Sequence, residues 1–95
     1  MKPLQLGKVV GTPAALRELE RAGIPPASLL LRHQSGDFGS LSLHDQKANE
    51  QALTDGGRIL SSYRLDTGVT IWLITEGTDD SGVRQSTCIL LPDEY

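Results

Sequence analysis

The sequence predicts an α+β domain in which N-terminal helices pack on a C-terminal three-stranded antiparallel β-meander. Segments with helical spacing and helix-capping residues fill the first half of the chain, whereas apolar residues after Gly57 follow the alternating period of strands. A chain of 95 residues with 38% hydrophobic content can bury one core. We therefore expect a single domain over residues 1–95.

The first predicted helix spans residues 12–23. Thr12 can cap its start, Pro13 suits the first helical position, and Gly23 suits a left-handed stop. Residues 6–10 precede this helix, and their apolar character predicts either a short additional N-terminal strand or an extended arm beside the sheet.

Two further helices are predicted before the strands begin. Residues 27–34 follow a pair of prolines and are apolar over most of the helix circumference, which predicts a buried helix. The third helix begins at Ser42, whose hydroxyl and the Asp45 carboxylate match the capping-box pattern, and it ends at Gly56. Its few apolar residues predict packing at the edge of the core.

Three segments rich in β-forming residues follow and are predicted to be strands. They span residues 58–65, 69–76 and 84–91. The loop ending in Gly68 fits a three-residue hairpin turn. That turn would place Tyr63 beside Ile71 and Arg58 opposite Glu76.

Both faces of the predicted sheet carry apolar residues. On the face turned away from the helices these residues are Leu60, Trp72, Ile74, Cys88 and Leu90. A sheet with one face in water normally shows polar side chains there, so this face needs a cover. The N-terminal arm, a helix or another protein chain would each serve, and Trp72 is a candidate binding residue for a protein partner or for a homodimer.

Charge and composition exclude several classes of protein. Nine Lys and Arg against twelve Asp and Glu give a net charge of -3, and the basic residues are scattered, so a nucleic-acid partner is not expected. The chain has neither an apolar run that would span a bilayer nor the apolar core of a secretory signal. We therefore expect a cytoplasmic location and no membrane partner. A single cysteine, Cys88, excludes an intramolecular disulfide.

The densest group of chemically capable side chains lies at the end of the second helix. Arg32, His33, Asp37 and Phe38 fall within one short stretch that contains two glycines. Imidazole titrates near neutral pH and a carboxylate can orient it, so His33 and Asp37 are candidate catalytic residues, with all four as candidate binding residues. The same residues also suit a purely structural role, as cations at a helix C-terminus and an Asx turn.

Two residues outside this stretch extend the candidate site. Asn49 lies on the third helix facing the loop, and Tyr63 supplies a hydroxyl from the first strand of the meander. A metal site built from His33, Asp37 and His44 lacks the spacing of known zinc motifs, and phosphate-loop and dinucleotide fingerprints are absent. We therefore predict no metal and no cofactor.

Several segments together resemble a family of small uncharacterised bacterial proteins. The matching motifs are Arg32-His33-x-x-Gly36-Asp37-Phe38-Gly39, then Asn49, Arg58-Ile59-Leu60-Ser61-Ser62-Tyr63, Ile71-Trp72-Leu73-Ile74-Thr75-Glu76 and Ile89-Leu90-Leu91-Pro92-x-x-Tyr95. Relatives occur on plasmids and integrated mobile elements, labelled plasmid-related protein or type I restriction subunit M. Phe38 stands where a Trp is expected in relatives, and the loop over residues 77–83 looks longer than theirs.

The methyltransferase label does not fit the residues present. Such an enzyme needs a much larger cofactor fold and an Asn/Asp-Pro-Pro-Tyr/Phe loop, whereas this chain offers Ile24-Pro25-Pro26-Ala27. The resemblance and the composition lead us to expect a non-catalytic, protein-binding accessory protein of a mobile genetic element, one that modulates a host defence or plasmid-maintenance complex. The alternative is a small enzyme or ligand-binding protein with a pocket around Arg32, His33, Asp37 and Asn49.

Overall fold

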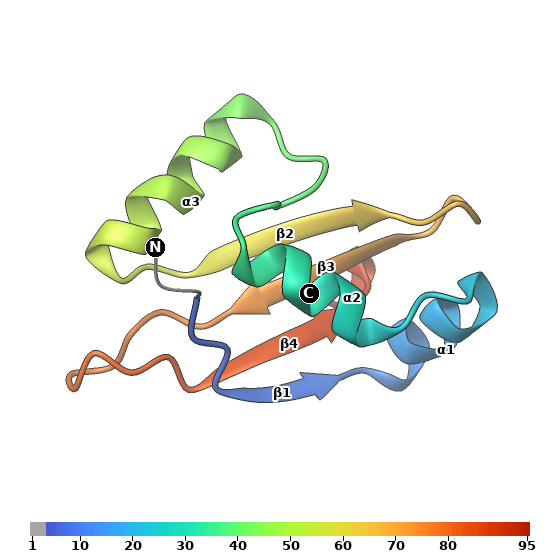
Figure 1. The fold of residues 1–95 in the computed structure, drawn as a ribbon, viewed down its shortest axis with the longest axis horizontal. Helices are drawn as coiled ribbons and strands as arrows, with labels where there is room; N and C mark the ends of the chain where they lie inside the picture. The colour runs from blue at the N-terminus through green and yellow to red at the C-terminus, as the bar shows by residue number, and fades with distance from the viewer. Residues whose placement is uncertain (1–3) are drawn as a thin grey trace.

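The computed structural model describes residues 4–95 and confirms the α+β class; the first three residues of the opening segment lie outside this range. The elements are β1 (Lys8–Gly11), α1 (Pro13–Ala22), α2 (Pro26–Gln34), α3 (Leu43–Asp55), β2 (Ile59–Arg64), β3 (Thr70–Thr75), β4 (Ser86–Leu90) and the 3-10 helix η1 (Pro92–Glu94). Figure 1 shows α2 in front of the sheet, α1 beside the ends of β1 and β4, and α3 beyond the β2 edge. Within the described residues, no helix combines the length and apolarity that a membrane span requires.

The sheet corrects the prediction of a three-stranded meander. It is a mixed sheet of four strands in the order β1-β4-β3-β2, in which β2, β3 and β4 form the antiparallel meander and β1 lies parallel to β4. The Lys8 N–H donates to the Gln85 carbonyl and the Thr12 N–H donates to the Ile89 carbonyl, each at 2.9 Å. The apolar segment before α1 is therefore a strand of the sheet. Its pairing joins the two ends of the chain, which no local turn signal announces.

The hairpin register follows the prediction, with one difference in the side-chain pairs. Tyr63 pairs with Ile71, and the Leu65 N–H donates to the Val69 carbonyl at 2.8 Å. The expected contact of Arg58 with Glu76 is not among the ion pairs of residues 4–95. The Arg58 guanidinium carbon lies 5.1 Å from the ring centre of Tyr95, because the end of the chain returns to this part of the sheet.

Helix α1 begins and ends at the predicted residues, whereas α2 is less buried than predicted. The Thr12 hydroxyl accepts from the Ala15 N–H, and Gly23 has a φ of 69°. In α2 only Leu29 and His33 are buried, and Leu31 is 67% exposed. Leu30 is partly buried against the main core. The helix is short and only one of its sides meets the sheet, so Leu31 faces outward despite its apolar character.

The main core lies between the sheet and the first two helices. It consists of Ala15, Leu19, Leu29, Tyr63, Leu65, Ile71, Leu73 and Ile89. A smaller cluster of Leu4, Ala52 and Ile59, with Phe38 packed against it, joins α3 to the edge of the sheet. The N-terminal arm thus packs with Phe38 and α3 and does not cover the opposite face of the sheet.

That opposite face, which we call the open face, is partly covered by η1 and Tyr95, which the sequence did not indicate as a cover. Its residues are Val10, Leu60, Ser62, Trp72, Ile74, Cys88 and Leu90. The rings of Trp72 and Tyr95 pack edge to face with centroids 5.9 Å apart, and η1 lies over β3. Figure 1 shows this last segment behind the sheet, on the side away from α2.

Candidate functional site

His33 lies in the core, where a chain of hydroxyl groups satisfies both of its ring nitrogens. The residue is 0% exposed. Its Nδ1 lies 2.5 Å from Ser61 Oγ, and its Nε2 lies 2.7 Å from Thr75 Oγ1. The chain then continues from Thr75 Oγ1 to Thr87 Oγ1 at 2.7 Å and to the Leu6 carbonyl at 2.8 Å. This network joins α2 to three strands and to the N-terminal arm.

The direction of each hydrogen bond in the His33 network follows from the Leu6 carbonyl, the acceptor at its end. The Leu6 carbonyl can only accept, so Thr87 donates to it and must accept from Thr75. The Thr75 proton is thereby used, and His33 Nε2 must carry a proton and donate to Thr75. His33 Nδ1 then accepts from Ser61. The arrangement specifies one neutral tautomer of the imidazole.

Electrostatics hold His33 in that neutral form. Burial, with a further contribution from the nearby Arg84 cation, lowers the pKa of His33 from 6.5 to about 4. A general base needs reach to solvent or substrate and a pKa near the working pH. The environment of His33 supplies neither, so the geometry gives it a structural role in the network.

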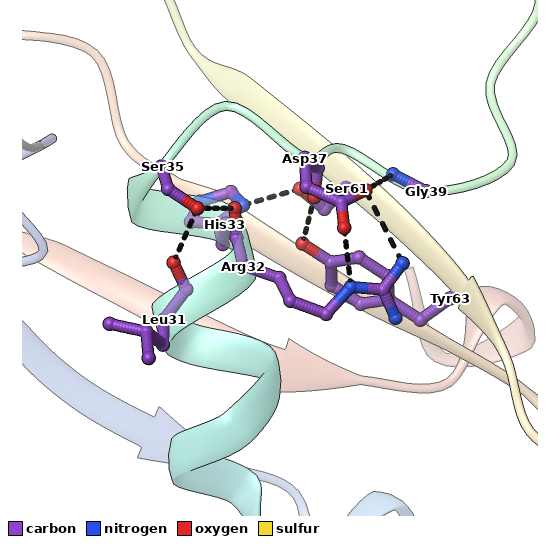
Figure 2. Close-up of polar contacts among 8 residues, drawn as sticks. All are labelled: Leu31, Arg32, His33, Ser35, Asp37, Gly39, Ser61 and Tyr63. Carbon is purple, nitrogen blue, oxygen red and sulfur yellow. Dashed lines mark hydrogen bonds and ion pairs between the residues drawn. The ribbon is translucent and has the colours of Figure 1, made fainter.

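Arg32, Asp37 and Tyr63 do converge beside the end of α2, with Arg32 and Asp37 exposed and Tyr63 buried beneath them. Arg32 Nε and Nη2 donate to the two carboxylate oxygens of Asp37 at 2.7 and 3.3 Å, and the guanidinium carbon lies 4.4 Å from the centre of the Tyr63 ring. The Tyr63 hydroxyl donates to the Asp37 carbonyl oxygen at 2.6 Å. Figure 2 shows Arg32 reaching from the helix to both partners.

The charges in this group neutralise one another. The hydrogen bond from Arg32 lowers the pKa of Asp37, and the same bond raises the pKa of Arg32. Asp37 Oδ1 also accepts from the Gly39 N–H at 3.2 Å, and burial raises the pKa of Tyr63. These contacts fix the loop over residues 36–39, so the predicted Asx-type role of Asp37 is fulfilled.

Phe38 and Asn49 close the outer edge of β2. The Asn49 side chain donates to the Leu60 carbonyl at 2.6 Å and accepts from the Leu60 N–H at 3.1 Å. The Ser62 N–H donates to the Phe38 carbonyl at 3.0 Å, and the Ser62 carbonyl accepts from the Ser40 N–H at 2.7 Å. Asn49 is buried, and its amide substitutes for a neighbouring strand.

Arg84 is a buried cation that sequence reasoning did not single out. It is 5% exposed and donates to the carbonyls of Gly57, Glu76 and Ala52 at 2.6, 3.0 and 3.1 Å. Burial lowers its pKa. Because the Ala52 carbonyl belongs to the last turn of α3, the guanidinium also complements the negative end of that helix. Arg84 thereby anchors α3 to the ends of β3 and β4.

Two adjoining clefts lie between the end of α2 and α3. The larger, of about 380 Å³, is lined by Leu4, His33, Gln34, Ser35, Gly36, Phe38, Glu50, Leu53 and Thr54. The smaller, of about 210 Å³, is lined by Gly36, Asp37, Phe38, Gly39, Gln46 and Glu50. Arg32 and Asn49 line neither cleft. Of the four residues predicted to form one pocket, Arg32 and Asp37 pair at the surface, and Asp37 also lines the smaller cleft. His33 is buried behind the larger cleft, and Asn49 lies at the edge of β2.

The open face presents the other candidate surface. Trp72, Leu60 and Cys88 are half-buried, Val10 is 41% exposed, and Tyr95 is 64% exposed. Burial, with Glu94 and Glu76 nearby, raises the pKa of the Cys88 thiol above 9.0, so it is not a thiolate at neutral pH. Cys88 contributes to this surface as a small apolar side chain.

Three residues of the His33 network were missed in the sequence, although their pattern could have indicated them. Ser61, Thr75 and Thr87 alternate with buried aliphatic residues on the helical face of the sheet and are 0% exposed. Buried hydroxyls need partners, and three of them in neighbouring strands indicate a polar side chain from a helix. Arg84 and Tyr95 gave no comparable pattern. Among residues 4–95, no three His, Cys, Asp or Glu side chains gather as metal ligands would.

Comparisons of the chain with family models, with curated proteins and with solved structures found no match.

Proposed function

We propose that this chain is a non-catalytic protein-binding module that docks a partner protein on the open face. The observation that carries the proposal is the apolar surface around Trp72, where Trp72, Leu60 and Cys88 stay partly accessible although η1 and Tyr95 pack over it. Large contiguous apolar patches on a folded protein mark interaction sites, and tryptophan is enriched among the residues that dominate binding energy.

The arrangement of the polar residues supports the same proposal. His33 is buried and neutral, and Arg32 and Asp37 pair with each other. Their contacts organise the loop and the strand edge, which is what a binding scaffold needs from them. The resemblance to proteins of plasmids and integrated mobile elements supports an accessory role, with a partner from a host defence or plasmid-maintenance complex.

The test is affinity capture from the native host with matched variants. Trp72→Ala removes the central aromatic of the open face, and Leu31→Ala removes an apolar side chain that is 67% exposed on α2. We expect one protein to be recovered with the wild type and with Leu31→Ala. We expect Trp72→Ala to bind it at least about thirtyfold more weakly, because truncating a central aromatic costs about 2 kcal/mol or more.

A second surface variant keeps this test independent of stability. Tyr95→Glu places a charge at a side chain that is 64% exposed, and should also weaken capture. Thermal melting of each variant separates lost binding from lost folding. A partner that binds both open-face variants as tightly as it binds the wild type would refute the docking surface.

The larger cleft favours a second candidate function, the binding of a small cationic ligand. Its volume of about 380 Å³ falls within the usual range of ligand pockets, and apolar Phe38 and Leu53 line it together with the carboxylate of Glu50. The carbonyl end of α2 lies at the same cleft, so a positive charge is favoured there. Titration with spermidine and with simple primary amines, followed by NMR, should shift the cleft residues, and Glu50→Gln should abolish the shifts.

A further inference from the structure

The outer edge of β1 is a sheet edge whose backbone groups have no partner within residues 4–95. In a strand, alternate residues direct their N–H and C=O groups to opposite sides. Lys8 and Thr12 bond to the β4 side at 2.9 Å, so Val9 and Gly11 direct theirs outward. Figure 1 shows β1 along the lower border of the sheet with no segment beyond it. The opposite edge, at β2, is closed by Asn49 and the loop before α3.

Apolar side chains flank this open edge on both faces of the sheet. Val9 and Val10 are each 41% exposed, and Leu16 is 40% exposed. Proteins commonly protect a sheet edge with charged residues, prolines or bulges. Lys8 is the single charged residue of β1.

The edge is complementary to itself in an antiparallel register with a two-fold axis at Val10. That register pairs Val9 with Gly11 of the partner subunit, and these residues then exchange the backbone hydrogen bonds that point outward. Gly11 has no side chain, and Leu16 lies over it, about 3.0 Å from where a Cβ would stand. Val9 would therefore pack against Leu16 of the partner subunit, and Val10 against Val10 of the partner subunit.

Charge is also complementary in this register. Lys8 lies opposite Thr12 of the partner subunit, and Thr12 Oγ1 donates to Glu94 Oε1 at 2.7 Å within its own chain. Lys8, Val10 and Thr12 share the open face of the sheet, on which η1 places Glu94. In this register each Lys8 would reach the carboxylate of Glu94 of the partner subunit, and the two-fold axis would form this pair twice.

We propose that β1 pairs antiparallel with β1 of a second copy of this chain, so that one sheet runs through both copies. A four-residue strand buries less surface than the roughly 1,200–2,000 Å² of a stable complex, so the dimer should be reversible, with a dissociation constant in the micromolar range or weaker. The pairing covers Val10 at the border of the open face but leaves Trp72 available, so either proposal can fail without the other.

The test combines sedimentation with amide hydrogen exchange on the full chain. Sedimentation velocity from about 10 μM to about 1 mM should show a monomer–dimer equilibrium. At the high end, the Val9 and Gly11 amides should become protected from exchange relative to dilute samples. Val9→Pro removes an outward N–H that β4 does not use, and should weaken dimerisation about tenfold or more through the hydrogen bonds lost on both strands.

A charge series supplies the second measurement. Lys8→Glu sets like charges opposite each other and should weaken the dimer about tenfold, and adding Glu94→Gln should restore most of that loss because the amide keeps the local contacts without the charge. A chain that stays monomeric up to about 1 mM would overturn the proposal. A dimer that forms equally well with Val9→Pro and with Lys8→Glu would also overturn it, and would point to the open face.

Discussion

At the scale of single residues, His33 couples the stability of the fold to pH. Its pKa in the folded protein is about 4, compared with 6.5 for the free side chain, so between these values the unfolded chain binds a proton that the folded chain excludes. The stability that the neutral His33 contributes is therefore fully present above pH 6.5, and it is lost progressively as the pH falls to about 4. The difference between the two pKa values corresponds to about 3 kcal/mol in the free energy of unfolding.

A variant of His33 makes this coupling measurable. His33→Gln removes the titrating group while keeping an amide donor, so the protein should be less stable at pH 7 but should show a flatter dependence on pH between 6.5 and 4.5. Denaturant unfolding at a series of pH values gives the slope. The slope of the wild-type protein, measured in the same way, is the reference. A His33→Gln variant with that same slope would contradict the assignment.

Arg84 stabilises the fold through hydrogen bonds from its buried cation to backbone carbonyls. Arg84→Met keeps much of the apolar stem but removes a donor from the Gly57 and Glu76 carbonyls. The Ala52 carbonyl loses one of two donors and keeps the Gly56 N–H. We expect a loss of roughly 3 kcal/mol in the free energy of unfolding. Arg58→Met, at an exposed arginine over Tyr95, should lose about 1 kcal/mol or less. Urea unfolding compares the two, and equal losses would refute the anchoring role.

At the scale of elements, the closed edge of β2 depends on the glycine that lets the loop approach it. Gly39 has a φ of 76°, and a Cβ there would collide with the carbonyl oxygen of Ser62. Gly36 has a φ of 89° with open space around it. Gly36→Ala should therefore lose only the conformational cost of about 1–2 kcal/mol, and Gly39→Ala should lose roughly 3 kcal/mol or more.

Hydrogen exchange locates the effect of the Gly39 change. The Ser62 amide, which donates to the Phe38 carbonyl, should lose protection in Gly39→Ala and keep it in Gly36→Ala. Similar losses of stability in the two alanine variants would show that the steric contact contributes nothing beyond the left-handed conformation.

Elements with local sequence signals were predictable, including the short N-terminal strand that was one of two alternatives for its segment. The pairing of that strand, which depends on a distant contact, was not predictable. Thr12 and Gly23 mark the ends of α1, and the β2–β3 register follows from a short turn. The β1–β4 pair joins Lys8 to Ser86, and no turn between them reports that contact. The apolar run of α2 does not show which side of the helix meets the sheet, so the exposure of Leu31 was mispredicted.

The candidate site was predicted in composition but not in arrangement. Arg32 and Asp37 do meet, because the helix end and the glycine-containing loop bring them together locally. His33 and Asn49 point elsewhere, His33 toward hydroxyls on three strands and Asn49 toward the backbone of β2. The hydrogen-bond partners of both side chains depend on how the helices pack on the sheet, and residue spacing along the chain does not encode that packing.

At the scale of the whole molecule, the two faces of the sheet are stabilised unequally. Helices cover one face, which also contains the His33 network, whereas within residues 4–95 a short 3-10 helix and Tyr95 pack over Trp72 on the open face. A partner that docks on the open face would complete the layer that a sheet with two apolar faces requires. The exposed fraction of Trp72 therefore reports whether that layer is in place.

Trp72 is the single tryptophan of the chain, so its fluorescence reports directly whether Tyr95 shields it from water. Tyr95→Ala removes the ring that packs against Trp72 at 5.9 Å and over which Arg58 lies. Emission should shift to longer wavelength and acrylamide quenching should rise, while the free energy of unfolding falls by about 1 kcal/mol. Tyr95→Phe keeps the ring and should match the wild type in emission and quenching. If Tyr95→Ala left both unchanged, the last residue would not be the cover, and Trp72 would owe its partial burial to its neighbours within the sheet.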